Sequence, residues 1–211
     1  MWEGLQDHVI ICGWSTKAEI IIAEYRATPS MRLVPIVVLS EFEGDRVPVL
    51  PIDKQKGVYF LNDDFTRVAA LEQAGIHRAH TCIVLSDTSG QRSEQDADAR
   101  TILAALTVEK LNPDVFTCAE LLNASYGSHL EMGGVNDFVV SGEYGAYLLA
   151  QAATNRGLMS VFTELMTCER GNEFYRITVP SSCVGKSFGE CLATLKDEHD
   201  VILVAVHPQG G

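Results

Sequence analysis

A strand-like run, a glycine and a helix-like run follow one another near the start of the chain. In the stretch HVIICGWSTKAEIIIAEY, residues 8–25, Gly13 holds the place of the first glycine of the dinucleotide fingerprint G-x-G-x-x-G. Ser15 and Ala18 stand at the other two places. Alanine still permits close packing of helix on strand, whereas a side chain at the second place crowds a pyrophosphate. The turn therefore keeps part of a dinucleotide-binding motif.

The residues after the first strand form a candidate phosphate site. A helix N-terminus presents unpaired N–H groups and the positive end of the helix dipole to an anion. We therefore expect Gly13, Trp14, Ser15 and Thr16 to lie beside the phosphates of a bound nucleotide. Ser15 or Thr16 is equally well explained as an ordinary N-cap, and both interpretations stay open at this stage.

Acidic residues follow three further strand-like runs. Glu41 ends the second run, where a dinucleotide fold uses an acid to accept hydrogen bonds from the adenosine ribose. Asp63 and Asp64 follow the third run, and Asp87 follows the fourth. Ligands of such folds bind at the carboxyl ends of the strands. Each acid alone could be a helix cap, but together they predict a binding site at one edge of a sheet.

The segment SDTSGQRSEQDADAR, residues 86–100, is rich in acids and includes Asp96 and Asp98. Hard cations such as Ca²⁺ bind several carboxylate and carbonyl oxygens on a loop. The spacing of an EF-hand is missing here. Acids in the first turn of the following helix, where they interact favourably with its dipole, explain the segment as well as a cation site does.

The runs between these acids alternate in type. Strand-like runs that are apolar throughout are typical of strands buried on both faces of a parallel sheet. They cover residues 8–12, 33–40, 57–61, 81–86, 115–120 and 136–140. Helical stripes of apolar residues cover 16–27, 65–74 and 94–111. Strands alternating with helices predict a Rossmann-like, doubly wound parallel α/β sheet over residues 1–141.

The alternation of strand-like and helical runs ends after residue 141. Residues 142–168 predict two helices that are separated by a turn near 155–157. Both helices carry apolar residues around much of their circumference. We expect this hairpin to pack on another subunit through residues 143–167, although packing on its own domain is the alternative. Residues 169–211 then predict a small α+β lobe, with strands in 171–180 and 200–211 around a helix in 187–199. We expect this lobe to be cut short.

Composition limits the partners of the chain. The 211 residues carry 16 Lys+Arg and 28 Asp+Glu, a formal charge of −12, which argues against nucleic acid and anionic membrane surfaces. The six cysteines form no Cys-x-x-Cys pair, so a reducing cytosol is the simpler compartment. The six histidines are scattered and no nucleophile elbow is present, so we predict no catalytic residues.

Several stretches together resemble a known family. DHVIICGWS, NDDFTRVAALEQAGIHRAHTCIVLSD and DADARTILAALTVEKLNPDVFTCAELL resemble the RCK domain (regulator of K⁺ conductance) of the TrkA N-terminal class. VPSSCVGKSFGECL is similar to the TrkA C-terminal unit of that family. The resemblance covers nearly the whole chain. It implies a cytoplasmic gating-ring domain, linked to the pore of a potassium channel in the membrane, that binds NAD(H), an adenine nucleotide or Ca²⁺.

The resemblance also implies roles for single residues. Gly13 matches the glycine of the family, Glu41 its ribose acid and Asp64 its base-contacting acid. The sequence GWS resembles that of the calcium-gated archaeal channel of this family. Of the acidic positions that form the calcium site in that channel, only Glu120 is still acidic in this sequence. The other two positions fall on Leu85 and Leu122. A cation site would therefore combine Glu120 with other acids, for which Asp96 and Asp98 are the candidates.

The leading hypothesis is a non-enzymatic regulatory domain that passes the energy of ligand binding to a pore. The soluble regulatory subunit of a potassium uptake transporter is one alternative. An NAD-dependent oxidoreductase is another, but it needs a substrate domain that the small C-terminal lobe does not supply.

Overall fold

The chain divides into two compact units. The computed structural model describes residues 4–42, 48–167 and 174–206. The first unit spans residues 1–173 and the second spans residues 174–211. The first unit contains both the predicted sheet domain and the predicted hairpin.

A six-stranded parallel sheet forms the centre of the first unit. Its strands lie in the order β3-β2-β1-β4-β5-β6, and every neighbouring pair is parallel. They are β1 (His8–Cys12), β2 (Ile36–Ser40), β3 (Val58–Asn62), β4 (Ala79–Val84), β5 (Phe116–Leu121) and β6 (Asp137–Val140). All six predicted strands are present, and the predicted doubly wound α/β fold is confirmed. The order reverses between β1 and β4, which creates a topological switch point.

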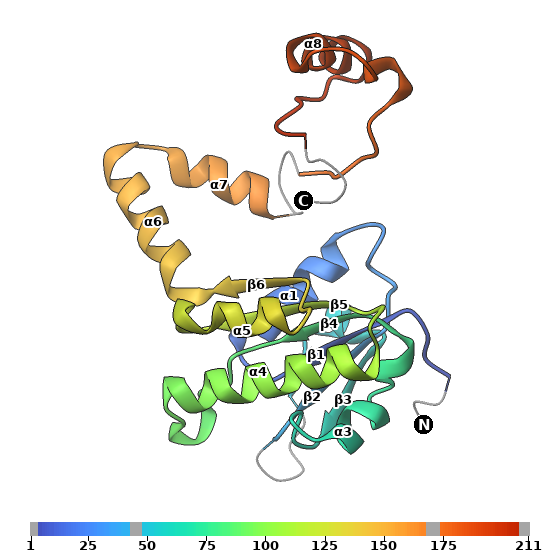
Figure 1. Cartoon of the computed structure of the whole chain (residues 1–211), viewed down its shortest axis with the longest axis vertical. Coiled ribbons are helices and arrows are strands. Elements are labelled where there is room, and N and C mark those ends of the chain that lie inside the picture. Colours follow the sequence, from blue (N-terminus) through green and yellow to red (C-terminus); the bar gives the residue numbers. More distant parts are fainter. Residues whose placement is uncertain (1–3, 43–47, 168–173, 207–211) are drawn as a thin grey trace. The chain divides into compact units, whose positions relative to one another are not determined.

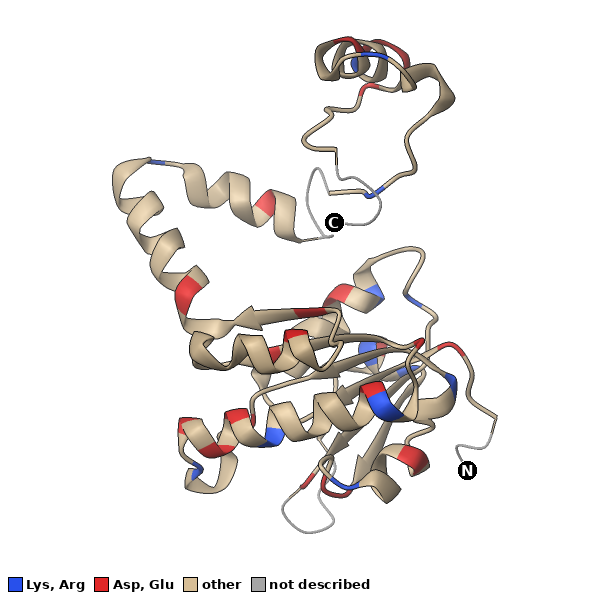
Figure 2. Cartoon of the chain, in the orientation of Figure 1, with Lys and Arg blue, Asp and Glu red and all other residues tan. Residues whose placement is uncertain are grey.

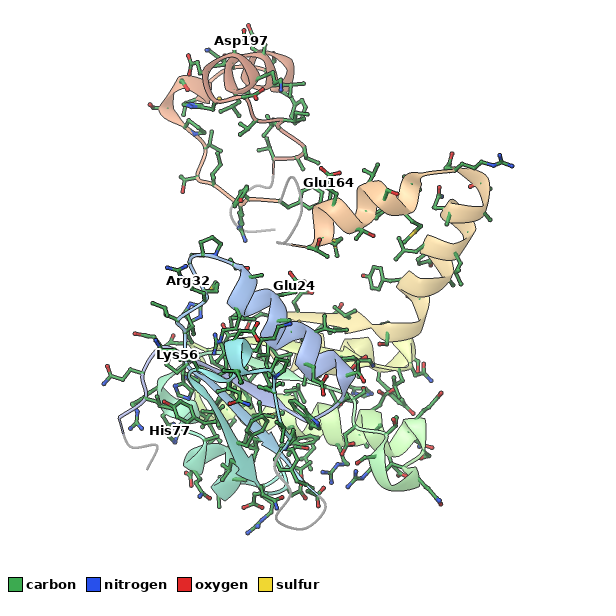
Figure 3. All side chains as sticks on the ribbon, turned by 180° about the vertical axis from the view of Figure 1, so that it is seen from behind. Glu24, Arg32, Lys56, His77, Glu164 and Asp197 are labelled. Carbon is green, nitrogen blue, oxygen red and sulfur yellow. The ribbon has the colours of Figure 1, made fainter. Side chains whose placement is uncertain are left out.

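Helices cover both faces of this sheet. Figure 1 shows α3 (Val68–Gln73), α4 (Glu94–Leu111) and α5 (Gly127–Met132) on the near face. The view from behind in Figure 3 shows α1 (Thr16–Ala27), with Glu24 labelled on it, across the other face. The short α2 (Ile52–Gln55) precedes β3. Because β1 and β2 are sandwiched between these layers, every residue in both strands is buried.

Side chains of β1 and β2 alternate between two hydrophobic clusters. Ile10 and Val37 belong to the cluster that packs against α3, α4 and α5, whereas Ile11 and Val38 belong to the cluster on α1. The register pairs Ile10 with Val37 and Ile11 with Val38, so each pair points to the same face. This packing fixes the carboxyl ends of the strands relative to one another.

Two helices follow β6, as predicted. They are α6 (Ser141–Thr154) and α7 (Leu158–Met166), and Gly157 between them has a left-handed φ of +87°. Neither helix contains a buried residue. Figure 2 shows few charged residues along them, in contrast to α4 of the sheet domain. No helix in the described part of the chain is long and apolar enough to cross a membrane.

Among the described residues of the second unit, 174–206, the one α-helix is α8 (Phe188–His199), which begins with a capping box made by Ser187 and Glu190. Its small core consists of Cys183, Cys191 and Leu195. The strands predicted in 171–180 and 200–211 are not formed in the residues that the structure describes there, 174–180 and 200–206. Alternation favours a strand, but two strands need further strands or a packing face to be stable. Residues 171–173 and 207–211 lie outside the described residues.

Candidate functional site

The turn between β1 and α1 requires its glycine. Gly13 has a φ of +96°, and its N–H donates to the carbonyl of Leu39 at 2.9 Å. A Cβ built on Gly13 would lie 3.3 Å from the carbonyl oxygen of Leu85, which follows β4. Only glycine combines this left-handed conformation with so close an approach at little cost. The turn therefore lies directly beside the switch point.

Ser15 is the N-cap of α1. Its backbone is extended, and its hydroxyl accepts a hydrogen bond from the N–H of Lys17 at 3.2 Å. Thr16 is the first residue of the helix. The capping interpretation of Ser15 thus holds. The N–H groups of Ala18 and Glu19 donate to the carbonyl of Ser15 at 3.0 and 3.4 Å, so a phosphate at this turn would depend mainly on the start of α1, at Thr16.

Trp14 lies at the same turn, and its ring packs against two other aromatic rings. Its ring meets the rings of Phe42 and Phe60 edge-on, with centroids 6.5 Å and 5.5 Å away. Phe42 follows Glu41 at the end of β2. This aromatic cluster links the phosphate turn to the position predicted for the ribose acid, so the fluorescence of Trp14 is a local probe of the site.

Three of the predicted acids come together through two arginines. Glu41 accepts hydrogen bonds from Arg92 at 2.9 Å and from Arg100 at 3.0 Å. Arg92 also donates to Asp87 at 2.6 Å, and Arg100 to Asp64 at 2.9 Å. We call these five residues the edge network. They join the ends of β2, β3 and β4 to α4.

The members of the edge network differ in exposure and electrostatics. Asp87 is buried, whereas the side chain of Glu41 is 47% exposed and open to a ligand. Burial alone would raise the pKa of Asp64, but hydrogen bonds from Thr66 and the charge of Arg100 lower it below its ordinary value. Asp64 therefore stays ionised and holds Arg100 in place.

The arginines were missed from sequence, although a signal was present. Arg92 and Arg100 are the only basic residues in the acidic segment 86–100. The guanidinium of Arg100 also lies 4.9 Å from the centre of the Phe65 ring. An open groove of about 500 Å³ borders both arginines. Its lining consists of Thr66, Arg92, Asp96, Ala99, Arg100 and Leu103.

Asp63 lies apart from the edge network. Its carboxylate accepts a hydrogen bond from Arg67 at 2.8 Å, in an i,i+4 pair on the surface, and another from the N–H of Asp64. Of the two neighbouring aspartates, the structure therefore brings only Asp64 to Glu41.

Glu120 lies at the end of β5 and its carboxylate is nearly buried, with 8% of the side chain exposed. It accepts hydrogen bonds from the ammonium of Lys17 and from the hydroxyl of Ser141. The N–H of Ser86 donates to its second oxygen at 3.1 Å. An ammonium group thus supplies the positive charge that this buried carboxylate needs.

The other two predicted cation ligands serve the protein itself. Asp98 is fully buried and accepts hydrogen bonds from the backbone N–H groups of Leu122 and Asn123, at 2.8 and 2.9 Å. Asp96 is exposed and pairs with the hydroxyl of Ser93, the N-cap of α4, at 2.7 Å. Among the residues that the structure describes, no group of three or more His, Cys, Asp or Glu could hold a metal ion. The cation site stays a prediction.

Comparison with known proteins identifies the family. The sequence model of the calcium-activated potassium channel slowpoke-like RCK domain matches residues 4–119, more than half of the chain. The chain belongs to the RCK domain family. The resemblance drawn from the sequence is thereby confirmed.

A channel protein is among the relatives of this RCK domain. The calcium-gated potassium channel TvoK of Thermoplasma volcanium is 30% identical over 155 residues, which are 73% of this chain and 42% of TvoK. The chain thus spans less than half the length of that relative.

Solved structures show the same fold. The TrkA-N domain of the inner membrane protein ybaL from Escherichia coli matches 72% of this chain and 99% of its own, with a TM-score of 0.54 and 16% identity. The human SLO3 gating ring matches 82% of this chain and 31% of its own, with a TM-score of 0.55 and 16% identity. At such identities the likeness concerns the fold of this RCK domain.

Proposed function

We propose that this RCK domain is the ligand-sensing regulatory domain of a potassium channel, and that its ligand is a nucleotide of the NAD or adenine nucleotide type. The observation that carries the proposal is the position of the Gly13 turn. It meets the end of β4 at the switch point, and Glu41, with its exposed carboxylate, directly follows the neighbouring strand β2. A nucleotide needs these two features together, one for phosphates and one for ribose.

The residues present fit such a ligand except at Ser15, whose side chain narrows the approach of a pyrophosphate to the turn. Its phosphates would lie on the first turn of α1, with Ser15 and Thr16, and its ribose hydroxyls would donate to Glu41. A carboxylate has about four acceptor positions, so Glu41 can accept the ribose while Arg92 and Arg100 hold it. The two arginines also offset the negative charge that would otherwise repel phosphates from this edge.

A divalent cation such as Ca²⁺ is the second candidate ligand, because the relative TvoK is a calcium-gated channel. The carboxylates of the site already have protein partners, which are Lys17 for Glu120 and two arginines for the edge network. A cation would have to displace one of these partners. The structure therefore favours the nucleotide as the ligand of the edge.

The proposal extends to assembly. The hairpin of α6 and α7 would join subunits into dimers and a gating ring, and a covalently linked pore domain would place this domain on the cytoplasmic side of a membrane. Ligand binding would shift the gate only by the difference in affinity between two arrangements of the ring. A regulatory subunit of a potassium transporter is the alternative for the same domain. Catalysis plays no part in either.

Thermal unfolding tests the ligand. We would measure the melting temperature with NAD⁺, NADH, ATP, ADP, AMP, Ca²⁺, Mg²⁺ and EDTA. A nucleotide at about 100 times its dissociation constant adds about 2.7 kcal/mol to the free energy of unfolding, a shift of several degrees for a domain of this size.

Two variants make the test specific. Glu41→Ala should abolish the nucleotide shift, whereas Asp63→Ala should preserve it, since Asp63 pairs with Arg67 on the surface. The absence of a shift with every nucleotide would contradict the proposal. A shift with Ca²⁺ alone would move the function to the second candidate.

A further inference from the structure

One buried carboxylate joins the phosphate turn to the helical hairpin. Glu120 accepts hydrogen bonds from Lys17 in the first turn of α1, from the N–H of Ser86 after β4, and from Ser141. Ser141 is the first residue of α6. The ends of two strands and the starts of two helices therefore meet at a single charged group.

Lys17 reaches this carboxylate across the switch point. It belongs to the helix that follows β1, while Glu120 is the last but one residue of β5, and β4 lies between these two strands in the sheet. The side chain of Lys17 thus passes over the carboxyl end of β4. Ligands of doubly wound folds bind in the crevice at this point, with their phosphates at the first helix. A bound phosphate and Glu120 would therefore compete for the same ammonium group.

The two partners of the ion pair are not equally free to move. The side chain of Lys17 is 48% exposed, whereas that of Glu120 is 8% exposed and is also held by Ser86 and Ser141. Lysine carries its charge on a flexible four-carbon chain. The ammonium group is consequently the mobile partner, and the carboxylate is the fixed one.

We infer that Lys17 exchanges between Glu120 and the phosphate of a bound nucleotide, and that this exchange couples ligand binding to the arrangement of the first turn of α6. The inference rests on the proposed function, since it requires an anionic ligand at the turn. When Lys17 turns to the phosphate, Glu120 keeps only neutral donors. The hydroxyl of Ser141 and the positive N-terminal end of α6 then compensate its charge. The arrangement of the first turn of α6 thereby comes to depend on the ligand.

A double-mutant cycle on affinity tests the exchange. We would titrate ADP and NAD⁺ against four proteins that all carry Trp2→Phe, so that the fluorescence followed is that of Trp14. The four are the otherwise wild-type chain, Lys17→Gln, Glu120→Gln and the double variant. Glu120→Gln should bind about tenfold more tightly, and Lys17→Gln about tenfold more weakly, the effect of one charge-assisted hydrogen bond. In the Lys17→Gln background, Glu120→Gln should have no further effect, because no lysine remains to compete for.

The cycle separates exchange from simple repulsion. A negative charge that merely repels phosphate would weaken binding with or without Lys17, so equal effects of Glu120→Gln in both backgrounds would overturn the inference. If Lys17→Gln fails to fold because Glu120 is left buried without a cation, the comparison of Glu120→Gln with the double variant still measures the contribution of Lys17. Similar affinities for these two variants would also overturn it.

Amide hydrogen exchange tests the coupling between ligand binding and the first turn of α6. At saturating ADP, the amides of residues 142–145 should change their exchange rates in the wild type and not in the double variant. Asp63→Asn, which removes a surface ion pair at the same edge, is the matched control and should respond as the wild type does. A wild type that binds neither nucleotide would refute the proposed function and this inference together. Binding without coupling would refute the inference alone.

Discussion

At the scale of the residue, the edge network shows how arginines prepare a carboxylate for a ligand. Both arginines bond the same oxygen of Glu41, from separate positions on the chain. Asp87 and Asp64 in turn orient the two guanidinium groups. Glu41 is thus exposed yet held in one orientation, which lowers the entropy that a ligand would lose in fixing it.

His8 is a buried residue with one unsatisfied nitrogen. Its Nε2 lies 2.9 Å from the carbonyl of Ala74, so Nε2 carries the proton and donates. Its Nδ1 has no hydrogen-bond partner among the described residues. Burial lowers the pKa of His8, and the charge of Arg78 lowers it further, against the opposing effects of Ala74 and Asp7. Protonation at Nδ1 would place an unpaired charge in the core.

The pKa of His8 predicts a loss of stability in mild acid. Because the folded state binds the proton less readily than the unfolded state, stability is full above about pH 6.5 and falls as the pH drops through and below that value. His8→Gln keeps a donor for Ala74 and does not titrate. We expect this variant to lose less free energy of unfolding between pH 7 and pH 5 than the wild type does, as measured in urea.

The control for this prediction is His80→Gln, since His80 is exposed on β4. Its pH dependence should match that of the wild type. Parallel pH profiles for the wild type and His8→Gln would contradict the account of His8.

At the scale of the element, Asp98 fixes α4 to the turn after β5. Its side chain is fully buried, and its two oxygens accept the N–H groups of Leu122 and Asn123. Ser86, which follows β4, also donates to it at 3.5 Å. The carboxylate therefore accepts hydrogen bonds from backbone N–H groups at the end of the sheet, as the carbonyl groups of a neighbouring strand would.

Replacement of Asp98 should be costly. Asp98→Ala removes a fully buried carboxylate and its two charge-assisted hydrogen bonds to the N–H groups of Leu122 and Asn123, so we expect a loss of about 3 kcal/mol in the free energy of unfolding. Asp96→Ala, two residues away, removes only an exposed contact with the N-cap and should lose about 0.5 kcal/mol. Chemical denaturation of both variants checks the prediction, and equal losses would contradict it.

At the scale of the whole molecule, the hairpin presents apolar side chains that the rest of the first unit leaves exposed. Leu149 on α6 is 74% exposed, and Met166 on α7 is 71% exposed. Further exposed apolar residues are Tyr144, Tyr147, Met159, Val161 and Phe162. An apolar face of this kind marks an interaction surface. It is the surface through which the proposed ring would assemble.

Charge placed on this face should weaken self-association. We expect the chain to form dimers at micromolar concentration in light scattering, and Leu149→Glu to shift it toward monomers by at least tenfold in dissociation constant. Ile52→Glu, at a residue of α2 that is 90% exposed, is the control and should leave the dimer intact. A wild type that stays monomeric at high concentration would refute the role of the hairpin.

The sequence by itself determined the fold class and the edge at which the acids gather. Strand and helix patterns are local, and the carboxyl ends of parallel strands necessarily lie at one edge, so Gly13, Glu41 and Asp64 could be placed there from sequence. The two strands predicted for the second unit are not formed in the residues described there, 174–180 and 200–206, for the complementary reason. Alternation shows what a segment could pair, but pairing depends on a partner surface.

Only the tertiary structure decided which charges meet. Arg92 and Arg100 lie 51 and 59 residues from Glu41, and Lys17 lies 103 residues from Glu120. Asp96 and Asp98 look alike in the sequence, yet one is exposed and the other buried. Helix orientation and strand order bring such groups together. A charged side chain gains its function from the group that it meets across the fold, because burial and pairing set the energy of a charge.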